Sequence, residues 1–154
     1  MGKSGHEMNS IDIDEKTAFL DTNILLYSID GSDEKKQEQA RSLIQTLMEK
    51  GAPVISTQVL MEFYNASVSK LKIDKVSAKY FVDKFSKMRV VTVDVPMIKR
   101  AIDTCILYQL SQWDALIVSA AEYAKCSLLI TEDLSHEQLI NGVKIVNPFI
   151  LKNS

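Results

Sequence analysis

The chain has 154 residues, of which 46% are hydrophobic and 25% are charged. These proportions are those of an ordinary globular protein, and the length suffices for one domain with a substantial core. The net charge of −2 argues against a surface that is basic throughout. No stretch approaches the ~18 consecutive apolar residues of a membrane span, and no N-terminal apolar run resembles a signal peptide. We therefore expect a cytoplasmic protein that does not enter a membrane.

Cysteine and histidine are too scarce for the usual cross-links or zinc sites. Cys105 and Cys126 lie in apolar surroundings and are expected to be small core residues in a reducing compartment. His6 and His136 do not combine with them at any usual zinc-ligand spacing. Neither a disulfide framework nor a zinc centre is therefore expected.

The N-terminal segment differs from the rest of the chain. Residues 1–17 are polar, contain Gly2 and Gly5, and show no sustained hydrophobic period. We interpret them as a flexible tail or leader. A single domain is expected over residues 18–152, because no Pro- or Gly-rich linker divides that stretch.

The expected elements alternate between strands and helices. In chain order they are a strand over 18–21, helices over 22–29 and 34–49, a strand over 54–56, helices over 57–69 and 76–87, a strand over 89–93, helices over 94–110 and 111–124, and strands over 127–130 and 143–146. The strands are short continuous apolar runs, as in sheets covered on both faces, and the helices have one apolar face. This pattern predicts an α/β fold with a mainly parallel central sheet flanked by helices.

Four carboxylates flank the most apolar segments of the chain. Asp21 closes the apolar run 18–20, and Asp133 follows the apolar run 128–130 by three residues, whereas Glu62 and Asp114 lie in the first turns of expected helices. Ligands of such sheets bind beyond the carboxyl ends of the strands, so we expect the four acids to converge there. Acids beside core segments are costly unless they are paired or bind a cation. The set therefore predicts a divalent-metal site with oxygen ligands.

The chemistry of such a site is that of phosphodiester hydrolysis. Carboxylate oxygens suit Mg²⁺ and Mn²⁺, and three or four acids can hold one ion or two ions about 4 Å apart. These ions polarise a phosphodiester and lower the pKa of bound water. Without metal, the clustered acids would repel the backbone of a nucleic acid.

Two of the acids have simpler explanations as helix caps, and a third as a surface residue. Asp114 follows Ser111 by three residues, which is a capping-box spacing. Asp21 could be the N-cap of the helix that begins at Thr22. Glu62 could pair with a basic side chain on an exposed face, although its neighbours are apolar.

The residues around the last acid also leave alternatives open. Asp133 could be a turn residue, with Glu132 taking its place as the fourth acid. Asn23 and Thr131 could orient a carboxylate or a metal-bound water, although a turn explains Thr131 equally well. Trp113 is expected to pack in the core, and stacking on a base is the alternative.

Basic residues are concentrated in one part of the chain. Residues 70–100 hold nine Lys and Arg against three acids, and the remainder holds the other nine basic residues and seventeen acids. This asymmetry permits a basic face beside an acidic site. A solvated helical surface explains it equally well.

The segments around the four acids resemble those of PIN-domain nucleases, in particular the VapC-like toxins. They are residues 19–27, 55–65, 113–121, 129–134 and 142–149. The likeness spans about residues 18–149 and implies a three-layer PIN-like sandwich. It further implies a metal-dependent endoribonuclease, in which a water activated by Mg²⁺ or Mn²⁺ attacks RNA in line.

The resemblance also implies roles for individual residues and partners. Asp21, Glu62, Asp114 and Asp133 would form the catalytic, metal-binding quartet, supported by Asn23 and Thr131. Family members are commonly homodimers and are inhibited by a small cognate antitoxin. Two other functions stay open: a PIN-like nuclease of RNA processing or repair, and a module that binds RNA or protein without cutting.

Overall fold

The structure is a computed structural model that describes residues 17–150. The expected leader over residues 1–17 lies outside the described residues except for Thr17, which begins the first strand. The strands are β1 (Thr17–Leu20), β2 (Ala52–Ser56), β3 (Arg89–Val91), β4 (Leu128–Ile130), β5 (Leu139–Ile140) and β6 (Val143–Val146). The helices are α1 (Thr22–Ile29), α2 (Glu34–Lys50), α3 (Thr57–Ser69), α4 (Lys75–Phe85), α5 (Val95–Tyr108) and α6 (Gln112–Tyr123).

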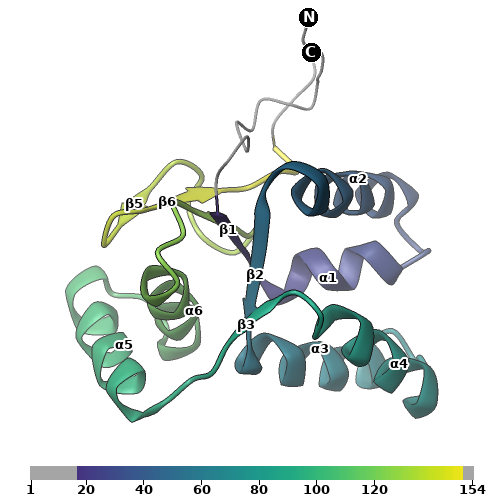
Figure 1. Cartoon of the computed structure of the whole chain (residues 1–154), viewed down its shortest axis with the longest axis horizontal. Coiled ribbons are helices and arrows are strands. Elements are labelled where there is room, and N and C mark those ends of the chain that lie inside the picture. Colours follow the sequence, from purple (N-terminus) through teal and green to yellow (C-terminus); the bar gives the residue numbers. More distant parts are fainter. Residues whose placement is uncertain (1–16, 151–154) are drawn as a thin grey trace, which may run out of the picture.

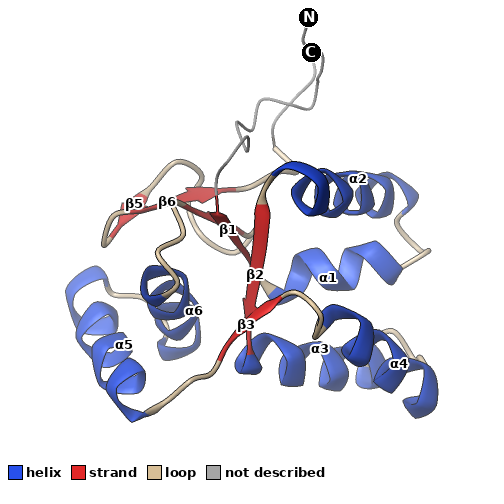
Figure 2. Cartoon of the chain, in the orientation of Figure 1, coloured by secondary structure: helices blue, strands red, loops and turns tan. Residues whose placement is uncertain are grey.

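The strands form one mainly parallel sheet, which confirms the expected fold class. Their order is β3-β2-β1-β4-β6-β5, and every pairing is parallel except that of β5 with β6. Helices α1 to α4 lie on one side of the sheet, and α5 and α6 lie on the other (Figure 1). Figure 2 shows the resulting three layers, with the strands between two sets of helices.

The apolar strands form the centre of the core. Phe19, Leu20, Leu129 and Ile130 are fully buried in the neighbouring strands β1 and β4. Such continuous burial is the reason these strands lack the alternating pattern of a half-exposed sheet. Cys126 is buried, as expected, and Cys105 is half-buried. In the stretch from residue 17 to residue 150, no helix is long and apolar enough to cross a membrane.

Side-chain caps determine where the helices begin. Each described helix follows an Asp or Ser whose side chain accepts a hydrogen bond from a backbone N–H of the first turn. These caps are Asp21, Asp33, Ser56, Asp74, Asp94 and Ser111. The expected helix starts therefore agree with the structure to within one residue, because short polar side chains mark them in the sequence.

Several strand bounds differ from expectation: β1 covers Thr17–Leu20 instead of 18–21, β2 begins at Ala52 instead of residue 54, and β4 begins at Leu128 instead of residue 127. β3 ends at Val91 instead of residue 93, and the Val93 N–H donates to Thr57 Oγ1 at 3.2 Å. β5 was not expected, since its two residues are too few for a periodic pattern. It pairs with β6 through a turn at Asn141 and Gly142, whose φ angles are +51° and +83°. Asn-Gly favours such a hairpin turn and was the available sequence signal.

Candidate metal centre

The site begins where β1 and β4 end side by side. Leu20 pairs with Ile130, so the next residues, Asp21 and Thr131, lie adjacent at the carboxyl edge of the sheet. Thr131 Oγ1 donates to Asp21 Oδ2 at 2.8 Å, and the backbone N–H of Thr22 donates to Asp21 Oδ1 at 2.7 Å. Asp21 is thus the expected helix cap, and its buried carboxylate is held through both oxygens.

Asp133 joins this group through Asn23 and Thr131. Its backbone N–H donates to Thr131 Oγ1 at 3.0 Å, which forms a turn after β4. Asn23 Nδ2 donates to Asp133 Oδ2 at 3.0 Å and lies 3.5 Å from Thr131 Oγ1. The other amide atom, Asn23 Oδ1, is buried and has no hydrogen-bond partner among the described residues. Both polar residues singled out in the sequence therefore contact the acids.

Glu62 faces the same site from α3. Its Oε1 accepts a hydrogen bond from Thr22 Oγ1 at 3.0 Å, and its Oε2 accepts one from Gln58 Nε2 at 3.0 Å. The alternative of an exposed ion pair is wrong, since Glu62 is half-buried and its partners are neutral. Gln58 was not recognised in the sequence, although its i,i+4 spacing from Glu62 puts both on one helix face.

Asp114 enters the site in the first turn of α6. Its backbone N–H donates to Ser111 Oγ at 3.1 Å, so the expected capping interaction is present. The Trp113 carbonyl accepts a hydrogen bond from Gln58 Nε2 at 3.4 Å, which brings this end of α6 against α3. The Trp113 ring is not in the core as expected, because the residue is 59% exposed.

Burial and neighbouring carboxylates raise the pKa values of Asp21 and Asp114. Burial raises the pKa of Asp21 from 3.8 to about 7, and the charges of Asp133 and Glu62 add to this effect against the opposing hydrogen bonds. Burial also raises the pKa of Asp114, with the same two charges contributing. The four acids therefore lie near enough to repel one another electrostatically.

The carboxylate and amide oxygens of these residues are ligands that a hard cation prefers. Their side chains are nevertheless spread more widely than a bound ion requires. Among residues 17–150, no three Asp, Glu, His or Cys side chains are grouped tightly enough to hold a metal ion. None of the four acids takes part in an ion pair in this part of the chain. Buried Asn23 Oδ1 and Gln58 Oε1 also have no partner there. Carboxylates without ion pairs, together with amide oxygens that lack a hydrogen-bond donor, are ligands suited to Mg²⁺ or Mn²⁺.

Glu132 points into a different network. Its carboxylate accepts hydrogen bonds from Tyr27 Oη at 2.7 Å and from Lys36 Nζ at 3.0 Å. The Lys36 ammonium group also lies over the rings of Tyr27 and Phe149, 4.7 and 4.9 Å from their centroids. Glu132 is thus already neutralised by Lys36, whereas neighbouring Asp133 is bound by neutral groups.

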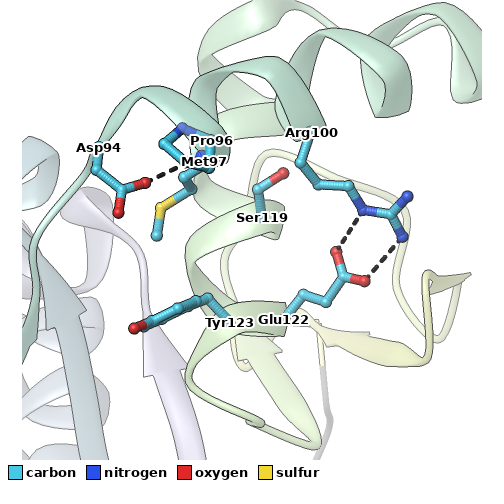
Figure 3. A pocket seen from close by; sticks show the side chains of 7 residues that line it. All are labelled: Asp94, Pro96, Met97, Arg100, Ser119, Glu122 and Tyr123. Atoms are coloured by element: carbon cyan, nitrogen blue, oxygen red, sulfur yellow. Dashed lines mark hydrogen bonds and ion pairs between the residues drawn. The ribbon is translucent and has the colours of Figure 1, made fainter.

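A separate hollow of about 290 Å³ lies between α5 and α6 (Figure 3). It is lined by Asp94, Pro96, Met97, Arg100, Ser119, Glu122 and Tyr123. The Arg100 guanidinium closes one side by donating to Glu122 at 2.8 and 3.2 Å. This hollow includes none of the four candidate acids, so we place the candidate site at the edge of the sheet.

The family of the chain follows from comparison with known proteins. The model of the PIN domain matches residues 18–140, and the chain therefore belongs to the PIN-domain family. This membership agrees with the resemblance seen in the sequence. No curated protein matches the chain significantly by sequence.

Solved structures share the fold. VapBC2 from Rickettsia felis, bound to a DNA fragment from its promoter, is 20% identical and has a TM-score of 0.63, covering 84% of this chain and 96% of that one. A toxin–antitoxin complex from Klebsiella pneumoniae is 21% identical with a TM-score of 0.63, covering 87% and 99%. VapC20 from Mycobacterium tuberculosis, a toxin that cleaves the sarcin–ricin loop, is 14% identical with a TM-score of 0.60, covering 73% and 86%. At these identities the likeness establishes the fold.

Proposed function

We propose that this protein is a divalent-metal-dependent endoribonuclease and the toxin of a toxin–antitoxin pair. One observation carries the proposal: four acids from separate elements lie near one another at the carboxyl edge of the sheet, and among residues 17–150 none of them forms an ion pair. Retaining such charges in a folded protein costs free energy. Binding of Mg²⁺ or Mn²⁺ would offset this cost, because the cation neutralises the carboxylates.

Each side chain has a part in this proposal. Asp21, Glu62, Asp114 and Asp133 hold the cation, and Asp133 is preferred to Glu132 because Lys36 already neutralises Glu132. When bound, Mg²⁺ or Mn²⁺ supplies an activated water and neutralises charge on the phosphate.

The supporting residues orient the acids. Thr131 fixes the buried Asp21 carboxylate, and Asn23 fixes Asp133. Among residues 17–150 the acids are more dispersed than a bound cation requires, so binding would draw their side chains closer together.

RNA is the proposed substrate. All nine basic residues of segment 70–100 are exposed, as phosphate binding requires. The exposed Trp113 adjoins Asp114 and offers a ring on which a base can stack. The cleavage of RNA by VapC20, a structure of the same fold, supports this choice of substrate.

A small antitoxin and a second copy of the chain are the proposed partners. Solved structures with this fold include toxin–antitoxin complexes from several bacteria. For the homodimer, support comes from α5, which exposes an apolar stripe at helical spacing. It consists of Val95, Ile98, Ile102 and Ile106. A stripe of this kind is typical of a surface covered by a protein partner.

The test of the proposed activity compares metals and variants on one RNA pool. Wild-type protein is incubated with mixed cellular RNA plus Mg²⁺, Mn²⁺ or EDTA, beside Asp114→Asn and the exposed control Asp103→Asn. We expect discrete cleavage that needs metal, disappears in Asp114→Asn and persists in Asp103→Asn. Binding without cleavage in any metal would instead favour a non-cutting module.

The toxin role needs a separate experiment, because a nuclease of RNA processing or repair would also cut RNA. Expression of the wild type should arrest cell growth, and Asp114→Asn should not. Co-expression of a small protein encoded beside the gene should restore growth. Cleavage of RNA without growth arrest would favour the processing role.

A further inference from the structure

One amide side chain joins the two helices that carry Glu62 and Asp114. Gln58 lies in the first turn of α3 and donates through Nε2 to Glu62 Oε2 at 3.0 Å. The same nitrogen donates to the backbone carbonyl of Trp113 at 3.4 Å. Trp113 directly precedes Asp114, so Gln58 connects Glu62 to the turn of α6 that presents Asp114.

These contacts determine which way the amide of Gln58 faces. Both partners are acceptors, a carboxylate oxygen and a carbonyl oxygen, so the NH₂ group must point toward them. The reverse orientation would bring Gln58 Oε1 against two other oxygens. With the amide placed in this way, Oε1 is buried and has no hydrogen-bond partner in the part of the chain that the structure describes.

Gln58 Oε1 belongs to the amide that binds the Glu62 carboxylate, and a buried acceptor without a partner at this position calls for a donor that tolerates negative charge. Water attached to a divalent cation is such a donor, because Mg²⁺ and Mn²⁺ usually retain several of their waters when bound by carboxylates. Groups that hydrogen-bond to ligands and to bound water contribute strongly to metal affinity.

We propose that Gln58 is a positioning residue of the acidic site. Its NH₂ group orients Glu62 and ties it to the start of α6, and its carbonyl oxygen accepts a hydrogen bond from a water held at the carboxylates. The inference rests on the proposed function and extends it to a residue that is not itself an acid.

The chain contains a matched comparison pair on α2. Gln45 and Glu49 have the same i,i+4 spacing, and Gln45 Nε2 donates to Glu49 Oε2 at 3.4 Å. This pair is exposed, and α2 lies on the opposite side of the sheet from α6 (Figure 1). Replacing each glutamine by methionine removes the amide while preserving length and helix propensity. Gln45→Met therefore controls for the loss of an ordinary Gln–Glu contact.

The experiment measures Mn²⁺ binding to the full chain by electron paramagnetic resonance of free Mn²⁺, independently of RNA cleavage. We expect Gln58→Met to weaken Mn²⁺ binding by roughly 10-fold or more, as outer-shell substitutions do, and Gln45→Met to leave it unchanged. In a Glu62→Gln background, Gln58→Met should have a smaller effect, because the hydrogen bond would then orient a neutral amide in place of the charged ligand. Circular dichroism verifies folding, and Gln58→Ala replaces Gln58→Met if the latter does not fold.

The outcomes separate the inference from the proposed function. If the wild type binds Mn²⁺ and cuts RNA, but a folded Gln58 variant binds Mn²⁺ equally well, Gln58 is not a positioning residue and the proposed function stands. An equal effect of Gln58→Met with and without the Glu62→Gln change would overturn the orienting role. If the wild type neither binds Mn²⁺ nor cuts RNA, the proposed function fails and the inference fails with it.

Discussion

Thr131 Oγ1 donates a 2.8 Å hydrogen bond to Asp21 Oδ2 between two strand ends that are 110 residues apart in sequence. The same oxygen accepts the backbone N–H of Asp133 at 3.0 Å. One buried hydroxyl therefore connects the acid after β1 to the acid after β4. Strand pairing thus determines the relative position of these two carboxylates.

Removing this hydroxyl should weaken the fold in a way that depends on pH. Thr131→Val keeps the shape but cannot donate to Asp21. We expect it to lower the free energy of unfolding by about 1.5–3 kcal/mol at pH 8, where Asp21 is ionised, and by about 1 kcal/mol at pH 5. Urea unfolding measures both values, with Thr131→Ser as the control that retains the hydroxyl. Equal losses for the Val and Ser variants would contradict this role.

Asp21 should make the metal-free protein less stable as pH rises. Its pKa is raised from 3.8 to about 7, so the folded state favours the protonated acid. Protonated Asp21 makes its full contribution to the free energy of unfolding below about pH 4, and this contribution is lost as pH rises through 7. The asparagine of the Asp21→Asn variant does not ionise. The free energy of unfolding of this variant, relative to that of the wild type, should therefore increase over this range by up to about 4 kcal/mol.

Chemical denaturation in EDTA at pH 4, 5.5 and 8 measures this difference. Carboxylates distant from Asp21 titrate alike in both proteins and cancel, and Asp103→Asn controls for the loss of an exposed charge. The variant should also lose metal binding, so greater stability would accompany lost activity. Parallel stability curves for wild type and Asp21→Asn would show that Asp21 has no raised pKa.

The sequence contains enough information for the fold but not for every contact of the site. Continuous apolar runs and Asp or Ser caps mark the strands and helix starts, because burial and capping act locally. Gln58 was missed because one of its partners, the Trp113 carbonyl, lies 55 residues away. Glu132 and Asp133 are neighbours in a turn, and contacts with residues distant in sequence distinguish them. Tyr27 and Lys36 bind Glu132, whereas Asn23 binds Asp133.

Trp113 is exposed although most of the residues that follow it in α6 are apolar. It precedes an apolar helical segment, which suggested core packing, yet it lies at the exposed start of α6. Trp113→Ala should change the free energy of unfolding by less than about 0.5 kcal/mol. If the ring stacks on a base, RNA affinity should fall by roughly 10-fold.

Fluorescence anisotropy with labelled RNA tests this in an Asp114→Asn background, which prevents cleavage. Tyr123→Ala is the matched control, since Tyr123 is an exposed aromatic residue at the other end of α6. Equal RNA affinities for the Trp113 and Tyr123 variants would remove Trp113 from the proposed RNA surface.

The apolar stripe on α5 should determine the oligomeric state. Ile102 lies in the middle of this stripe, and Ile102→Glu places a charge where a second copy would exclude water. We expect the wild type to sediment as a dimer and Ile102→Glu as a monomer. Val76→Glu, at an exposed apolar residue of α4, should remain dimeric. A monomeric wild type, or a dimeric Ile102→Glu variant, would exclude this interface.

The most direct test of the proposed metal centre is to locate Mn²⁺ by anomalous X-ray diffraction from crystals of the wild-type protein grown with MnCl₂. We predict an anomalous peak at the carboxyl edge of the sheet, coordinated by Asp21 and at least one of Glu62, Asp114 and Asp133. Crystals of Asp21→Asn should lose that peak. An ordered structure with Mn²⁺ bound elsewhere, or with no peak among these acids at saturating MnCl₂, would contradict the proposed metal centre.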